Sequence, residues 1–213
     1  MTNPIHRAVL CLGFMTWLVA CAGTPSVTER YRLTPLSTQR SGTPATPGDA
    51  SSPVIVVEPY ATMGIYADPQ IVYRLEETTY GAYPNREWAI PLGTMLADAT
   101  VETMRAIPEL GVRVADERTA GSHGLVWRGV VQQFEEVNRG KKVGAAIRLD
   151  AALVRTAGDS VVWQGSVGLE RPVAHPTMPE IVRTLSELTS TAIRQLALQA
   201  RIAVQAERVA SVR

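Results

Sequence analysis

Apolar and polar residues alternate along two segments in the second half of the chain. The odd-numbered residues of 145–153 and most of those of 161–169 are apolar, with polar residues between them. An apolar residue at every second position predicts a strand with one buried face. Segment 125–135 alternates less regularly, which predicts a strand with a bulge. Turn residues at 138–140 and 157–159 predict that the three strands follow one another as hairpins.

Two other segments carry apolar residues at helical spacing. Pro91 suits the first turn of a helix that we expect to end near Ile107, and Pro179 opens a longer helix. The apolar stripe of the longer helix is lost towards the C-terminus, so we expect residues 203–213 to fray. Short β-branched or apolar runs predict further strands at 54–57, 71–75 and 112–114.

The order of these elements predicts an α+β fold. We expect one domain over residues 54–202, in which two helices pack on one face of a mainly antiparallel sheet. The preceding region, 21–53, contains many Ser, Thr, Pro and Gly residues and is expected to be a flexible tether. As a random coil, it would have an end-to-end distance of about 30 Å from Cys21 to Val54. Within it, Tyr31–Leu33 brings the first apolar side chains and is a candidate for a short edge strand.

Residues 1–20 have the three parts of a secretory signal. Arg7 supplies a positive charge, Ala8–Ala20 is an uncharged apolar run, and Leu18–Cys21 looks like the lipobox of bacterial lipoproteins. The run is shorter than the roughly 20 residues that a membrane span needs, although an uncleaved anchor or a buried helix is the alternative. We therefore expect cleavage before Cys21 and lipid on this cysteine.

The use of cysteine agrees with this interpretation. Cys11 would leave with the signal, so the mature chain keeps Cys21 alone and can form no disulfide within its body. Several acyl chains on one residue give stable anchoring. Ala22 follows the cysteine, rather than the Asp that commonly retains lipoproteins at the inner membrane. In a host with two membranes this favours the outer membrane, with the folded part facing the periplasm.

Charge and motifs exclude several functions. Lys+Arg (21) and Asp+Glu (20) nearly balance, and no basic run suits nucleic acid. His123 and His175 have no ligands at metal-like spacing, so we predict no metal and no cofactor. A nucleophile–base pair at Ser122–His123 is a minor alternative, and phosphate-binding and dinucleotide-binding motifs are absent from the sequence. We expect the protein not to be an enzyme.

Adjacent acids and tryptophans have simple structural interpretations. Glu76–Glu77 and Glu135–Glu136 are neighbours in predicted strands or turns, where adjacent side chains point to opposite faces. They are expected to form a solvated edge rather than an acid–base pair. The tryptophans expected in the core are Trp88, Trp127 and Trp163.

Tyrosines and basic residues suggest a contact surface. Five tyrosines fall between residues 60 and 83 and predict either edge packing or a surface for a partner or a lipid chain. Arg139, Lys141 and Lys142 form a cationic hairpin tip, expected to be solvated, with docking onto an acidic partner or anionic lipid as the alternative. The candidate partner contacts are Tyr73, Arg74, Tyr80, Lys141 and Lys142.

Several of these features occur together in one family. The chain resembles the auxiliary lipoproteins of ABC-type transport systems, the group that includes paraquat-inducible protein C, from about Tyr31 to Gln199. The motifs that carry the resemblance are Cys21, Tyr31-Arg32-Leu33, Ile55–Pro59, Ile71-Val72-Tyr73-Arg74 and Trp88-Ala89-Ile90-Pro91-Leu92.

The resemblance implies a non-enzymatic docking component for a protein with an MCE (mammalian cell entry) domain, which pairs with an inner-membrane ABC transporter for lipids or other hydrophobic molecules. Lipid on Cys21 would fix one end, and the α+β body would hold the partner. A ring-shaped partner would favour a homo-oligomer. The alternative is an outer-membrane lipoprotein that activates a peptidoglycan synthase or assists outer-membrane assembly, and a long tether would favour the synthase activator.

Overall fold

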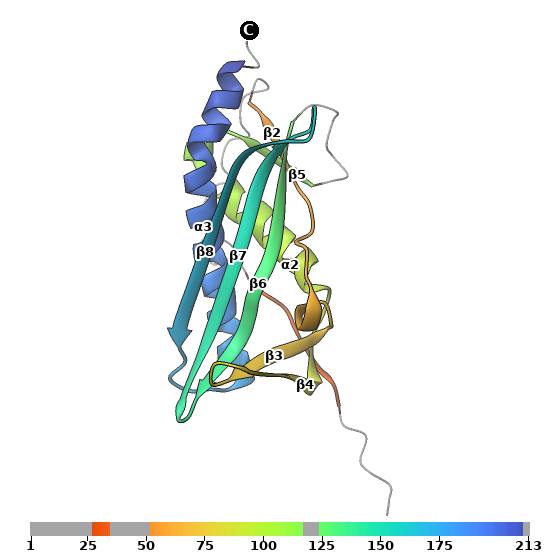
Figure 1. The fold of residues 1–213 in the computed structure, drawn as a ribbon, viewed down its shortest axis with the longest axis vertical. Coiled ribbons are helices and arrows are strands. Elements are labelled where there is room, and N and C mark those ends of the chain that lie inside the picture. Colours follow the sequence, from red (N-terminus) through yellow and green to blue (C-terminus); the bar gives the residue numbers. More distant parts are fainter. Residues whose placement is uncertain (1–26, 35–51, 117–123, 211–213) are drawn as a thin grey trace, which may run out of the picture.

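The computed structural model describes residues 27–34, 52–116 and 124–210, which form one elongated α+β body (Figure 1). The predicted signal, Cys21 and the Ser122–His123 pair lie outside these residues. Within the described part of the chain, no helix combines the length and the apolar composition that crossing a membrane would require.

Three long antiparallel strands form the larger part of the sheet. They are β6 (Leu125–Arg139), β7 (Lys142–Arg155) and β8 (Ser160–Pro172). The β6–β7 turn contains Gly140 at φ 59°, a left-handed conformation that glycine adopts without a steric penalty. The register of β6 shifts between Val131 and Gln133, so both the predicted hairpins and the predicted bulge are confirmed.

Shorter strands pair with the opposite side of β6. Next to its start lie β2 (Val54–Val57) and then β5 (Arg113–Asp116). Next to its end lie β3 (Gln70–Leu75), β4 (Thr79–Trp88) and β1 (Glu29–Tyr31). The parallel pairs are β1–β4, β2–β5, β2–β6 and β3–β6, so the sheet is mixed. The prediction of a mainly antiparallel sheet was wrong because side chains alternate with the same period in parallel and antiparallel strands.

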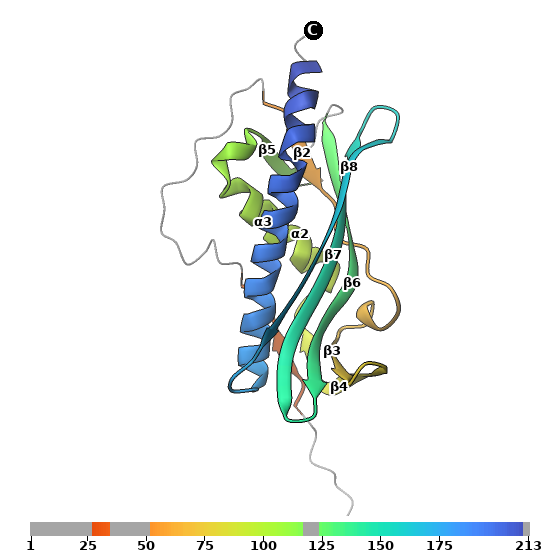
Figure 2. The same cartoon turned by 60° about the vertical axis from the view of Figure 1, so that its left-hand side comes forward.

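Among the described residues, two α-helices accompany the sheet. They are α2 (Leu92–Arg105) and α3 (Met178–Ala210), which lie together on one side of it (Figure 2). Short 3-10 turns are η2 (Gly64–Tyr66) and η3 (Pro108–Leu110). Val204 is buried and continues the apolar stripe of Leu196 and Ala200, so α3 remains helical to Ala210. The prediction of fraying from residue 203 is corrected over that range.

The segment before β2 is not a free tether throughout. β1 pairs in parallel with β4, and the Ala89 N–H donates to the Tyr31 carbonyl at 2.7 Å. Leu33 is buried in the core, and the Thr34 N–H donates to Ser186 Oγ on α3 at 3.2 Å. The chain is therefore attached to both the sheet and the long helix at residues 29–34, inside the region predicted to be a tether.

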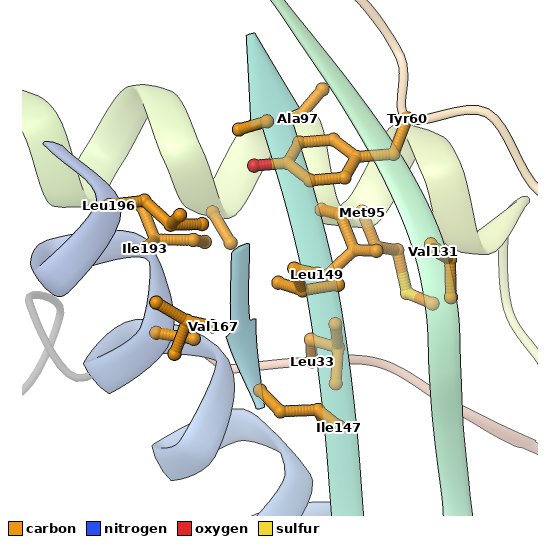
Figure 3. Packing of buried hydrophobic residues seen from close by; sticks show 14 of the residues in the cluster. Leu33, Tyr60, Met95, Ala97, Val131, Ile147, Leu149, Val167, Ile193 and Leu196 are labelled. Atoms are coloured by element: carbon orange, nitrogen blue, oxygen red, sulfur yellow. The ribbon is translucent and has the colours of Figure 1, made fainter. Parts of the chain in front are cut away.

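Apolar side chains from the helices and the sheet fill the core (Figure 3). A chain of hydrogen bonds crosses it, in which Trp127 Nε1 donates to the Tyr60 hydroxyl at 3.0 Å. Thr100 Oγ1 donates to the Leu96 carbonyl at 2.7 Å and lies 3.0 Å from the Tyr60 oxygen. Because the Thr100 hydroxyl has one hydrogen, Tyr60 is the donor to Thr100. This chain links β6 to α2 through Tyr60.

The three tryptophans occupy different depths. Trp88 and Trp127 are buried, as predicted, and the ring of Trp88 meets Phe134 edge-on at 5.7 Å between centroids. Trp163 is only half-buried, and its ring stacks on that of Trp127 with 5.5 Å between the ring centroids. The prediction of a core position is therefore confirmed for two tryptophans, and the third covers the rim of the core.

Candidate functional site

A buried ion pair joins β3 to β6. The side chain of Glu135 has no exposed surface, and Arg74 Nε donates to its Oε1 at 2.6 Å. Arg74 NH1 also donates to the Glu76 carbonyl at 3.1 Å. The β-ladder places Arg74 beside Val137, two residues after Glu135, so the guanidinium reaches the carboxylate between neighbouring parallel strands.

Further donors saturate the Glu135 carboxylate. The Tyr66 hydroxyl, from η2, donates to Oε2, and Gln133 Nε2 donates to Oε1 at 2.9 Å. Burial, and then the hydrogen bond to Glu135, raise the pKa of Tyr66 well above its usual range. A carboxylate with three donors around it, and no water-exposed edge, is suited to holding elements together rather than to proton transfer.

Glu136 makes a second cluster. The Tyr83 hydroxyl donates to its Oε2 at 2.9 Å, and Asn138 Nδ2 donates to its Oε1 at 2.8 Å. Burial and then the negative charge of Glu136 raise the pKa of Tyr83. The prediction of a solvated edge at Glu135–Glu136 is wrong, because β3 and β7 flank this part of β6. The clusters could not be found from spacing, since Arg74, Tyr66 and Tyr83 come from β3, η2 and β4, although Gln133 and Asn138 lie on β6 itself.

The predicted partner contacts gather at one end of the molecule, but they differ in exposure. Tyr73 is half-buried and packs against Tyr83 at 4.9 Å between ring centroids. Arg74 is buried, and its guanidinium is turned inward to Glu135. Tyr80, Lys141 and Lys142 are exposed. Contact of these residues with a partner remains a prediction.

Hydrogen bonds unite the β3–β4 and β6–β7 hairpins. The Glu76 N–H donates to the Asn138 carbonyl at 2.8 Å, and the Gly140 N–H donates to Glu76 Oε1 at 3.0 Å. Both hairpins lie at one end of the elongated body, and segment 27–34 runs to the same end (Figures 1 and 2). We call this part the anchor-side end, and we define it by its hairpin tips, residues 75–80 and 139–142.

At the anchor-side end, Arg139 forms ion pairs, whereas two lysines form none with other described residues. Arg139 binds Glu170 with two hydrogen bonds, and the bond from Arg139 lowers the pKa of Glu170. Arg139 also forms an ion pair with Glu77, in which Nε lies 3.6 Å from Oε1. Lys141 and Lys142 form no ion pair with other described residues.

Among the described residues, no three His, Cys, Asp or Glu side chains are placed to hold a metal ion. His175 is exposed in the loop between β8 and α3. The geometry thus defines an α+β body with saturated internal polar clusters and an N-terminal segment built into its sheet.

Comparison with known proteins places this body in a family. The family of ABC-type transport auxiliary lipoprotein components matches residues 31–197, and the chain belongs to this family. Membership indicates a location in the cell envelope and an auxiliary role in transport. A comparison with curated proteins finds no match.

Solved structures share the fold. Protein XCC0632 from Xanthomonas campestris is 22% identical, with a TM-score of 0.64 over 84% of this chain and 98% of that one. An uncharacterised protein is 19% identical, with a TM-score of 0.64 over 81% of this chain and 98% of that one. Both are similar in fold and, at these identities, indicate nothing more specific.

Proposed function

We propose that this protein is a non-catalytic docking component of an MCE-type ABC transport system for lipids or other hydrophobic molecules. Lipid on Cys21 holds it on a membrane, the outer one in a two-membrane envelope, and its body faces the periplasm and binds the MCE-domain partner. The ATPase of the system supplies the energy. A homo-oligomer would match a ring-shaped partner.

The observation that carries this proposal is the attachment of residues 29–34 to the body. Seven residues separate Cys21 from Glu29, so their Cα atoms are at most about 26–29 Å apart, whereas a free chain to Val54 could extend to roughly 110 Å. A lipid on Cys21 would thus be connected to the sheet and to α3 by a short segment, which limits how far the body can move from the membrane. Such a link supports a role in which the body is held near the membrane while it binds its partner.

The same observation weighs against the synthase activator. That role would favour a long tether which carries the body away from its membrane, and the attachment of β1 leaves a short one. The internal clusters support a non-catalytic role as well, because the Glu135 carboxylate is shielded and fully bonded.

The test is affinity purification of the full-length protein from native membranes, with mass spectrometry of proteins and lipids. Cys21→Ala removes the acceptor of the lipid, and Cys11→Ala is the matched control within the predicted signal. We expect an MCE-domain protein and an ABC ATPase with the wild type and C11A, and weaker recovery with C21A. Recovery of a peptidoglycan synthase or an assembly factor without transport subunits would overturn the proposal.

A further inference from the structure

Segment 27–34, the first described part of the chain, runs to the anchor-side end (Figures 1 and 2). Glu29 pairs in parallel with Arg86, so Val27 and Thr28 lie in the direction of the start of β4. Six peptide units join Cys21 to Val27 and span at most about 20–22 Å. The 33 residues of α3 measure about 50 Å along the helix axis. Lipid on Cys21 would therefore keep the start of the described chain close to the bilayer and allow the opposite end to lie farther away.

Large apolar and aromatic side chains are exposed at the anchor-side end. Leu75 is 42% exposed and Tyr80 is 50% exposed, on either side of the β3–β4 turn. Tyrosine has an apolar ring with a polar tip and suits the boundary between lipid and water. Leu75 pairs with Thr79 and Tyr80 pairs with Arg74, so the two side chains lie on opposite faces of the hairpin near its tip, and each keeps about half of its surface exposed.

Cations project beside these residues. Lys141 lies in the β6–β7 turn and Lys142 is the first residue of β7, and neither forms an ion pair among the described residues. The carboxylates nearby are engaged: Glu76 accepts the Gly140 N–H, and Glu77 and Glu170 pair with Arg139. Lysine side chains attract anionic lipid only within about one Debye length, roughly 8–10 Å, so the short tether decides whether they can act.

The two hairpins present these groups as one unit. The hydrogen bonds that join Glu76 to Asn138 and Gly140 fix the tips side by side. The ion pair of Arg74 with Glu135 fixes the strands behind them. A surface that is already rigid loses little conformational entropy when it binds.

We propose that the anchor-side end is a docking surface for a bilayer that contains anionic phospholipid headgroups, with Lys141 and Lys142 on the headgroups and Leu75 and Tyr80 at the interface. This inference rests on the lipidation of Cys21 in the proposed function. It assigns three of the predicted partner contacts, Tyr80, Lys141 and Lys142, to the membrane, and it leaves the surfaces away from this end for the protein partner.

The experiment uses the full-length lipidated protein in nanodiscs of three parts phosphatidylcholine to one part phosphatidylglycerol. With the thiol of Cys21 acylated and the signal removed, Thr78→Cys provides a single thiol for a fluorophore at the anchor-side end. Gln205→Cys, exposed on the C-terminal part of α3, is the matched control. Headgroup-labelled spin lipid then quenches fluorescence according to proximity.

We expect strong quenching at T78C and weak quenching at Q205C. Lys141→Glu with Lys142→Glu should reduce the quenching at T78C, since each lysine near an anionic surface changes binding about fivefold. Quenching that is unchanged in the double variant, or equally strong in pure phosphatidylcholine discs, would overturn the proposal. So would a double variant that keeps its quenching but loses the transport partner, which would identify a protein as the occupant.

Two further measurements separate the possible failures. Failure of the unlabelled protein to enter nanodiscs would mean that Cys21 carries no lipid, which contradicts the proposed function itself. An unchanged urea midpoint in K141E/K142E would show that the variant is folded.

Discussion

Arg74 and Glu135 lie on neighbouring parallel strands, and the guanidinium is the one charged group that neutralises a carboxylate with no exposed surface among the described residues. The two residues are 61 positions apart in the sequence, yet their atoms approach to 2.6 Å. The pair fastens β3, and through it β4 and β1, to the long strand β6. It therefore connects the anchor-side end to the centre of the sheet.

Loss of one partner of this pair should be costly. Arg74→Met leaves the Glu135 charge buried, and we expect a loss of about 3–5 kcal/mol of unfolding free energy. Urea denaturation measures the change, with Arg148→Met, an exposed arginine on β7, as the control within about 0.5 kcal/mol of wild type. The double variant R74M/E135L should lose less than the sum of the single changes. Additive effects would contradict the coupling.

The hydrogen-bond chain through Tyr60 should be measurable in the same way. Tyr60→Phe removes the acceptor of the buried Trp127 N–H, so we expect a loss of about 1–3 kcal/mol. Tyr80→Phe removes the hydroxyl of a residue that is 50% exposed and serves as the control. Equal stability of the two variants would show that Trp127 finds another partner.

Gly129 provides a steric test of the same contact. A Cβ atom on Gly129 would lie 2.2 Å from Cε1 of Tyr60, so Gly129→Ala should cost about 1–3 kcal/mol or more. Gly168→Ala, also in a strand, places its Cβ 3.6 Å from Arg148 atoms, an ordinary contact. Thermal unfolding should therefore separate two substitutions that are chemically identical. Similar melting temperatures for both variants would contradict the packing of Tyr60 on β6.

Leu33 tests whether the segment before β2 belongs to the body. Leu33→Ala should lower the unfolding free energy by about 2–5 kcal/mol, because the side chain is buried. Val27→Ala, at a residue that is 82% exposed, should change it by less than about 0.5 kcal/mol. If L33A were as stable as V27A, residues 29–34 would be a free tether, and the distance from Cys21 to the body would not be short.

The buried phenols predict sensitivity to alkali. Burial is the main cause that raises the pKa values of Tyr60, Tyr66 and Tyr83 above the ordinary 10.0. The folded protein therefore keeps protons that the unfolded chain releases. This contribution to stability is complete below about pH 10 and falls as the pH rises through the folded-state pKa values. Urea midpoints measured from about pH 8 to 11 should fall more steeply for wild type than for the Tyr66→Phe variant. Equal slopes would contradict the raised pKa of Tyr66.

Local pattern was sufficient for most of the elements. The alternation in β7 and β8 and the helical spacing in α3 predicted these elements because burial of one face requires that spacing. The irregular alternation over residues 125–135 predicted a bulge, which the structure has between Val131 and Gln133. The end of α3 was predicted too early because burial of Val204 depends on what packs against it, which a single helix does not show.

The candidate site could be predicted only in part. The exposure of Lys141 and Lys142 could be predicted from the turn residues before them, since side chains at a hairpin tip are solvated. The burial of Glu135 could not be predicted, because two of its three donors, Arg74 and Tyr66, are distant in the sequence. Two adjacent acids are costly to bury unless such partners exist, and partners distant in sequence are invisible to a local pattern.

The sequence by itself thus determined the elements, the predicted lipid attachment at Cys21 and the resemblance to a transport auxiliary family. These depend on local spacing and on short motifs, which each segment carries by itself. Only the tertiary structure decided the strand directions, the attachment of Glu29–Tyr31 to β4 and the union of the two hairpin tips. Such features arise from pairing between distant segments, where backbone hydrogen bonds and burial, rather than the local pattern, select the neighbour.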